Sequence, residues 1–217
     1  MKILRNPHSS RTGFTLVEVM IASTIAVMAI AGTMALLLTA LQYYSLARDK
    51  VQMSYDIRMF TLELMKASRN AADFRIYDNF SSRTEQATNG VGDMVAFLYT
   101  NPDNEAQVVR VVTFYRDLGA ANNPDTKDQT LRKYDTGLQT AGTFDTSWLP
   151  PANTRTTNDV VVQTTADSTS TQTRLFQGIV YGGGAANAIG VSGRIVYENK
   201  ALQRLQNNFD IIIACRS

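Results

Sequence analysis

The chain of 217 residues has very few of the side chains on which most enzyme and metal sites depend. It holds one histidine, His8, and one cysteine, Cys215. A single cysteine excludes a disulfide within the chain, and its place after the letters IIIA is typical of a buried small hydrophobic residue. Beyond residue 8 no imidazole remains for a catalytic triad or a metal site. We therefore expect no catalytic residue, no metal and no cofactor, and we interpret the protein as a non-enzyme.

Charge of either sign is missing from a long stretch near the start. No Asp, Glu, Lys or Arg occurs in residues 19–47, which are mainly Ala, Ile, Leu, Met and Val. That run is longer than the roughly 20 residues that cross a hydrocarbon core as a helix. No proline occurs between Pro7 and Pro102, so no proline kink is expected. The sequence predicts a transmembrane helical segment over residues 14–47.

Basic residues precede this run. Lys2, Arg5 and Arg11 have no acidic neighbour, although the net charge of the whole chain is only +2. Positive charge before a span and a larger domain after it place the N-terminus in the cytoplasm and the domain outside it. A secretory signal peptide has an apolar region of about 7–15 residues, so the longer run argues against one. The small, dispersed charge does not indicate a nucleic-acid partner.

One acidic residue, Glu18, lies at the start of the apolar run, in the stretch RTGFTLVEVMIASTIAVMAIAG. An ionisable group in a membrane-spanning segment is costly and by default indicates a function. A plain membrane anchor explains the run, but it explains neither Glu18 nor the Gly13-Phe14 junction before it. The alternative that needs no function is that Glu18 snorkels to the headgroup boundary.

A basic leader, the letters GFTLVE at residues 13–18 and an apolar helix together resemble the N-terminus of type IV prepilins and type II secretion pseudopilins. The resemblance covers residues 5–45. It implies that a prepilin peptidase removes the leader, residues 1–13, by cutting between Gly13 and Phe14, and that Phe14 is then N-methylated. It implies as partners other pilins or pseudopilins, an inner-membrane assembly platform, and membrane lipid before assembly.

The resemblance also implies a role in assembly for Glu18, together with Thr15. After cleavage the α-amino group of Phe14 lies within about one helical turn of Glu18. In an isolated subunit in lipid we expect this carboxylate to lack a good partner, whereas in a filament it pairs with the α-ammonium of a neighbouring Phe14. We expect the pair to set subunit register rather than gross stability, because desolvation offsets most of the attraction.

Residues 48–72 carry an apolar face at helical spacing, which predicts an amphipathic half of the same helix. The face is formed by Met53, Ile57, Phe60, Leu64, Ala67 and Ala71. A second set widens it, namely Val51, Tyr55, Met59, Leu62 and Met65. We expect one helix from Phe14 to about Ala72, with its first half in lipid or in a filament core.

From residue 73 onward the pattern changes to short extended runs between turns, which predicts a β-rich extracytoplasmic domain over residues 73–217. The expected fold class is α+β, pilin-like, with an antiparallel sheet packed on the amphipathic half of the helix. The clearest hairpin joins two runs through the letters NPDNE. The candidate strands are residues 92–100, 106–117, 130–136, 158–165, 174–182, 193–199 and 208–216.

Several polar stretches of the domain invite a functional interpretation. Residues 140–159 and the Thr/Ser-rich residues 163–173 are best interpreted as surface loops, and residues 181–190 as a hairpin tip rather than a phosphate loop, because no Gly-Lys-Ser/Thr is present. The acidic residues near 103–105, and those near 125–128, lack the ligand spacing of a calcium loop.

The position within the family is left open by the sequence. Major pilins commonly have proline where Ala35 stands, glycine where Val27 stands, and a C-terminal cysteine pair. The strand motifs VVTFYRD and LRKYD look more like minor pilins of the W/J type, which the resemblance would place in a priming complex at the filament tip. A major pilin, or a membrane-anchored binding module such as an adhesin or DNA-uptake receptor, is the alternative.

Overall fold

The computed structural model describes residues 13–117, 130–154, 157–162, 175–180, 187–198 and 204–214. The chain divides into two units, Met1–Ala47 and Arg48–Ser217. The first unit holds the beginning of one long helix, and the second holds the rest of that helix and all the described strands. One helix followed by antiparallel strands confirms the expected α+β class.

The helix α1 (Leu16–Arg69) is 54 residues long and contains no proline, and its continuity agrees with the prediction of one helix. It is rich in Ala, Leu and Met, which are strong helix formers. It ends at Arg69 rather than at residue 72. The reason is that the N–H of Ala72 donates to the carbonyl of Leu98 in a strand, 2.8 Å away, instead of continuing the helix.

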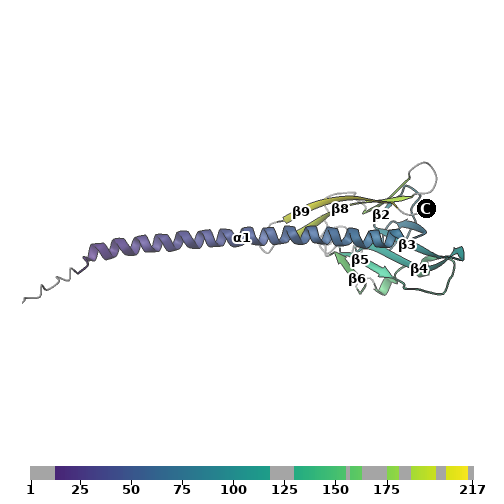
Figure 1. The fold of residues 1–217 in the computed structure, drawn as a ribbon, viewed down its shortest axis with the longest axis horizontal. Coiled ribbons are helices and arrows are strands. Elements are labelled where there is room, and N and C mark those ends of the chain that lie inside the picture. The colour runs from purple at the N-terminus through teal and green to yellow at the C-terminus, as the bar shows by residue number, and fades with distance from the viewer. Residues whose placement is uncertain are drawn as a thin grey trace, which may run out of the picture. The chain divides into compact units, whose positions relative to one another are not determined.

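The described strands form two antiparallel sheets (Figure 1). The first sheet has the order β1-β3-β4-β5-β6, and its strands are β1 (Asp73–Tyr77), β3 (Met94–Asn101), β4 (Asn104–Asp117), β5 (Thr130–Asp135) and β6 (Asp159–Val162). The second has the order β2-β7-β8-β9, and its strands are β2 (Val91–Gly92), β7 (Phe176–Ile179), β8 (Ala188–Glu198) and β9 (Arg204–Ala214). The prediction of one sheet is therefore wrong.

The main hydrophobic core of the second unit lies between α1 and the inner faces of both sheets (Figure 1). Phe60 of α1 makes edge-to-face ring contacts with Phe114 of β4 and Phe209 of β9, at centroid distances of 6.4 Å and 5.9 Å. The buried residues of α1 confirm the apolar face predicted from helical spacing, and they are Met53, Phe60, Leu64 and Ala67, joined by Ser68.

Polar contacts also hold α1 to the first sheet. The hydroxyl of Tyr99 in β3 donates to the carbonyl of Ala67, 2.8 Å away, near the end of the helix. The ammonium of Lys133 in β5 donates to the carboxylate of Glu63 on α1, also at 2.8 Å. This hydrogen bond, with a second from Lys66, holds the pKa of Glu63 below its ordinary value.

The outer face of the first sheet is buried too, beneath the connection between β5 and β6. A second hydrophobic cluster there contains Tyr115 of β4 and Leu149, with Phe144 and Trp148 packed against it. Leu149 is 1% exposed. The sequence predicted that residues 140–159 form a surface loop, but the described part of this segment covers the sheet with its apolar side chains.

The chain passes from the second sheet to the first between β2 and β3. Gly92 ends β2, and a Cβ atom there would lie 2.0 Å from the carbonyl oxygen of Tyr77, so only glycine fits. Asp93 follows and is buried. Its side chain pairs with Arg116 of β4 and accepts the N–H of Leu175, the residue before β7.

Several predicted strands are confirmed. Asn101 pairs with Asn104 in the β3–β4 hairpin, and the Asn101 side chain accepts the N–H of Asp103, so the hairpin at NPDNE is correct. β5, β6, β7 and β9 overlap their candidates, whose remaining parts at 163–165, 181–182 and 215–216 lie outside the described residues. β8 begins at Ala188, inside the predicted hairpin tip, and β1 was not predicted.

Candidate functional site

The first described residues form a short segment before the helix. Gly13, Phe14 and Thr15 have no regular secondary structure, and α1 begins at Leu16. A Cβ atom on Gly13 would meet nothing within 4 Å, and Phe14 is 86% exposed. The Gly13–Phe14 bond is therefore not covered by the described residues. The leader charges Lys2, Arg5 and Arg11 lie outside them.

Thr15 and Glu18 form a reciprocal cap on the N-terminus of α1. The backbone N–H and the hydroxyl of Thr15 both donate to Oε2 of Glu18, at 2.9 Å and 3.0 Å. The N–H of Glu18 donates in turn to the Thr15 hydroxyl oxygen at 3.3 Å. This is a capping box, in which an N-cap threonine and an acid three residues later satisfy donors that the helix leaves open.

The capping box changes the interpretation of Glu18. We predicted from the sequence that its carboxylate lacks a good partner in an isolated subunit, but two donors from Thr15 bind Oε2. The other oxygen, Oε1, receives no hydrogen bond from the described residues. The spacing Thr-x-x-Glu before an apolar run was a sequence signal for this cap, and it identifies a local role for Thr15 as well.

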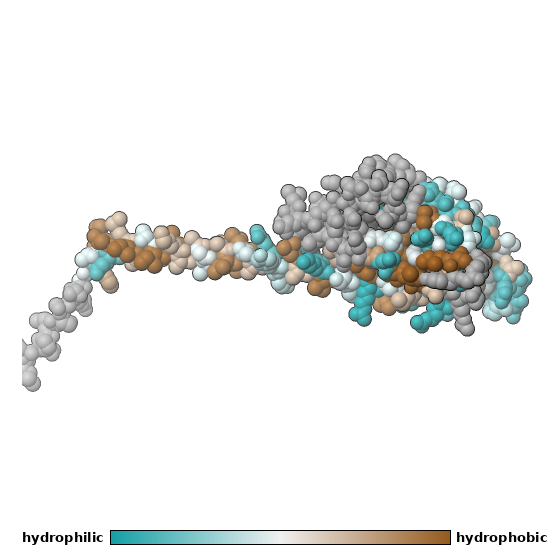
Figure 2. Space-filling view, turned by 90° about the horizontal axis from the view of Figure 1, so that it is seen from above, coloured by the Kyte–Doolittle hydropathy of each residue, from teal (hydrophilic) through white to brown (hydrophobic). Residues whose placement is uncertain are grey.

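The part of α1 in residues 19–44 is mostly apolar, and every residue in it is exposed in the described structure. It is long and apolar enough to cross a membrane, and its most apolar stretch is not buried against the described residues. Figure 2 shows this part of α1 with brown, hydrophobic residues along its length. In water such a surface is unfavourable at about 25 cal/mol per Å² of apolar area, so it needs lipid or protein around it.

Hydroxyl groups in the apolar run are satisfied within the helix. Each of five side chains donates to a backbone carbonyl three or four residues earlier, at 2.8–2.9 Å. Such bonds remove the donors that would otherwise be left unpaired in hydrocarbon. The five residues are Ser23, Thr24, Thr33, Thr39 and Ser45.

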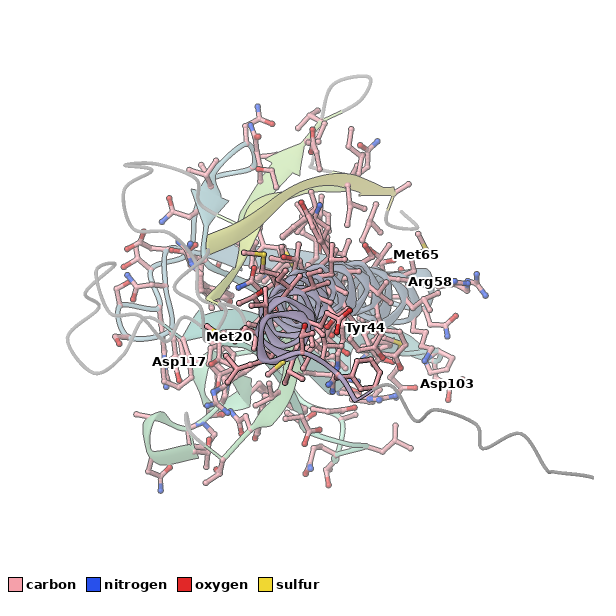
Figure 3. The ribbon with its side chains drawn as sticks, turned by 90° about the vertical axis from the view of Figure 1, so that its left-hand side faces the viewer. Met20, Tyr44, Arg58, Met65, Asp103 and Asp117 are labelled. Carbon is pink, nitrogen blue, oxygen red and sulfur yellow. The ribbon has the colours of Figure 1, made fainter. Side chains whose placement is uncertain are left out.

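A second apolar feature of α1 lies in the unit from Arg48 onward, and we call it the outer stripe. It consists of Val51, Tyr55, Leu62 and Met65, all of which are exposed. At 3.6 residues per turn these positions lie opposite the buried face around Phe60. Figure 3, viewed along the helix, shows Met65 and the neighbouring Arg58 pointing outward. The prediction that these four residues widen the core face is wrong.

The remaining candidates in the domain are turns. Asn101 and Asn104 accept backbone N–H groups from Asp103 and Ala106, so the acidic stretch near 103–105 is held as a turn. No group of three His, Cys, Asp or Glu residues in the described parts of the chain is arranged to hold a metal ion. The acidic residues near 125–128 and Cys215 lie outside the described residues.

Comparison of the chain with protein-family models, with curated proteins and with solved structures finds no match. Two features bear on function, namely the capped junction at residues 13–18 and the uncovered apolar surface of α1.

Proposed function

We propose that the protein is a non-enzymatic structural subunit of a type IV pilus or of a type II secretion pseudopilus. It is made as a precursor, cut between Gly13 and Phe14 by prepilin peptidase, and N-methylated at Phe14. Residues 14–47 hold it in the bacterial inner membrane, with the N-terminus in the cytoplasm and the domain outside. It then joins other pilins through an assembly platform.

The observation that carries this proposal is the GFTLVE junction, placed directly before an uncovered apolar helix. Gly13 and Phe14 lie outside regular secondary structure, so the bond between them is not held within the helix, which begins only at Leu16. A plain membrane anchor requires neither this exposed junction nor an acid at its first helical turn. A cleavage site followed by an assembly contact requires both.

The capping box supports a specific form of that assembly contact. Cleavage creates an α-ammonium on Phe14, and a neighbouring subunit's carboxylate is its natural partner in a medium of low dielectric constant. Oε2 of Glu18 is bound by Thr15, whereas Oε1 receives no bond from the described residues. An incoming ammonium binds Oε1 without breaking the cap, so the helix start and the subunit contact coexist.

The outer stripe supports association between subunits through the amphipathic half of α1. Its four apolar side chains face away from the domain's own core, and burying each against a neighbour contributes about 1–2 kcal/mol. A filament of subunits whose helices pack together covers the apolar run and the stripe at once. We propose a minor subunit of the W/J type, in keeping with Ala35 and Val27 in place of proline and glycine.

Mass spectrometry of the mature chain tests the processing. We expect a chain that begins at Phe14 and carries one added methyl group on its α-nitrogen. A membrane-embedded chain that retains residues 1–13 contradicts the proposal. Gly13→Val is the matched variant, because a branched side chain at the bond to be cut is expected to block cleavage.

Filament incorporation of two Glu18 variants tests the assembly contact. Glu18→Gln keeps an oxygen that accepts from Thr15 but removes the negative charge, whereas Glu18→Ala removes both. We expect both variants to be cleaved and neither to enter sheared filaments at the level of the unchanged chain. If Glu18→Gln assembles normally and Glu18→Ala does not, the cap and not the ion pair governs assembly.

Stoichiometry in the same filaments separates the alternatives. A minor subunit is expected at a small fraction of the most abundant pilin, and a major pilin dominates the preparation. A binding module that only shares the export route stays in the membrane after shearing, although its precursor is cleaved.

A further inference from the structure

Two adjacent tyrosines stand at the end of the uncovered run of α1. Tyr43 is 69% exposed and Tyr44 is 71% exposed. They are the first aromatic residues after Phe14, because residues 15–42 contain none. The two rings therefore differ in chemistry from the exposed aliphatic residues that precede them.

A tyrosine has an apolar ring and a polar tip, and both find suitable surroundings where hydrocarbon meets headgroups. Tyrosine and tryptophan are enriched at this depth of membranes for that reason. Four residues after Tyr44 comes Arg48, followed by Lys50, and both side chains are exposed. Long basic side chains one or two turns beyond the rings reach the level of the phosphates.

The length of the helix gives a second, independent measure. From Glu18 to Tyr44 there are 26 steps, or about 39 Å at 1.5 Å per residue. A bilayer's hydrocarbon core is about 30 Å thick, and the two headgroup layers bring it to about 40–45 Å. Glu18 and Tyr44 are therefore one membrane thickness apart, headgroup to headgroup, for a helix of small tilt.

We propose that Tyr43 and Tyr44 bind the outer headgroup layer of a phospholipid bilayer while the Thr15–Glu18 cap lies in the inner one. This inference rests on the proposed function, in which residues 14–47 are in the membrane before assembly. The tyrosine hydroxyls donate to lipid ester or phosphate oxygens, and hydrocarbon covers the residues between the two markers. Glu18 then occupies a polar layer and avoids most of the cost of a mid-membrane carboxylate.

Fluorescence quenching by lipids brominated near the headgroup or near the chain ends tests the depth. The full chain is placed in phosphatidylcholine–phosphatidylglycerol vesicles in a Trp148→Phe background, with Trp148→Tyr as a second background if folding is impaired. One tryptophan is then introduced at a time, as Ile30→Trp, Tyr44→Trp or Tyr55→Trp. All three positions are exposed in the structure, so each substitution leaves the core unchanged.

We expect shallow quenching to exceed deep quenching at position 44, deep to exceed shallow at position 30, and little quenching at position 55. Deep quenching at 44, or none at 44 with strong quenching at 30, overturns the inference but leaves membrane anchoring intact. If none of the three positions is quenched, the anchoring in the proposed function fails, and the inference falls with it.

Two double variants test whether the tyrosines fix the depth of α1 in the bilayer. With the reporter at position 30, Tyr43→Ala with Tyr44→Ala is expected to shift the ratio of deep to shallow quenching. Leu38→Ala with Leu41→Ala removes two exposed apolar side chains from the same region and serves as the control. Equal ratios in the tyrosine variant and the unchanged helix show that the rings do not anchor it, and this result also overturns the inference.

Discussion

The carboxylate of Asp93 lies 2.8 Å from the guanidinium of Arg116, and the same carboxylate accepts the N–H of Leu175 at 3.2 Å. Asp93 is buried and Arg116 is largely buried. The two partners of Asp93 come from different sheets, because Arg116 belongs to β4 and Leu175 precedes β7. A single side chain therefore joins the two sheets at the point where the chain passes between them.

Substituting Asp93→Asn is expected to lower the free energy of unfolding by about 3 kcal/mol. Removing one partner leaves the other charge poorly solvated, and that loss exceeds what the intact pair contributes. Urea unfolding of the full chain in detergent micelles measures it, with the fluorescence of Trp148, the one tryptophan of the sequence, as the signal.

Glu85→Gln is the control, because the ion pair of Arg75 and Glu85 is exposed on both sides. Such pairs contribute about 0–1 kcal/mol. Equal losses for the buried and the exposed pair contradict the assigned role of Asp93.

Leu149→Ala is expected to destabilise the domain by about 3 kcal/mol, because this side chain fills the cluster on the outer face of the first sheet. Leu138→Ala makes the same chemical change at a side chain that is 83% exposed, and we expect less than about 0.5 kcal/mol. The urea concentrations at the unfolding midpoints of the two variants measure this difference in stability. If they coincide, residues 136–154 do not cover the sheet in solution.

Gly92→Ala is expected to cost about 3 kcal/mol or more, since the added methyl group meets the backbone of Tyr77 and the strands have to separate. At Gly142 a Cβ atom has its nearest neighbour, a ring carbon of Trp148, at 3.6 Å, so Gly142→Ala is the matched control. Thermal unfolding of both variants measures the difference. A normal melting temperature for Gly92→Ala shows that β1 and β2 are not in close contact.

Tyr77→Phe is expected to make the domain more resistant to alkali. Burial, reinforced by the charge of Glu85, raises the pKa of Tyr77 to about 12. In the unfolded chain the phenol ionises near pH 10. Its contribution to the free energy of unfolding is therefore complete below pH 10 and is lost as the pH rises towards 12. Over this pH range the free energy of unfolding falls by an amount on the order of 2 kcal/mol because of Tyr77, and the Tyr77→Phe variant does not show this fall.

Urea unfolding at a series of pH values, followed by circular dichroism, checks this prediction. Tyr55→Phe removes an exposed hydroxyl and is expected to leave the alkaline limb of the stability curve unchanged. Identical alkaline limbs for Tyr77→Phe and the unchanged chain contradict the prediction.

Periodicity predicted the parts of this fold that depend on neighbouring residues. The buried face of α1 at Met53, Phe60 and Leu64 followed from spacing alone, and the β3–β4 hairpin followed from a turn signal between two apolar runs. The cap of Thr15 on Glu18 is equally local. Its sequence signal is the spacing Thr-x-x-Glu at residues 15–18.

The parts that were missed depend on residues far apart in sequence. β2 is only Val91–Gly92, and it pairs with Phe176 and Gln177 of β7, which lie more than 80 positions later in the sequence. Leu149 lies in a segment of polar composition, and no pattern in that segment predicts its burial. It is buried because the outer face of the first sheet carries apolar side chains on which it packs. The outer stripe is apolar like a core face, and helical spacing places it opposite the buried face; the positions of the sheets show which of the two faces is covered.

The link between Asp93 and Leu175 also fixes an order of events during synthesis. These two residues are 82 positions apart, whereas β1, β3, β4 and β5 are all complete by Asp135. A chain emerges N-terminus first, and contacts between distant residues form more slowly than local ones. We expect the first sheet to assemble on α1 while β7, β8 and β9 are still being made. For that interval Phe60 is covered on one side only, and the half-built domain is a substrate for chaperones and proteases.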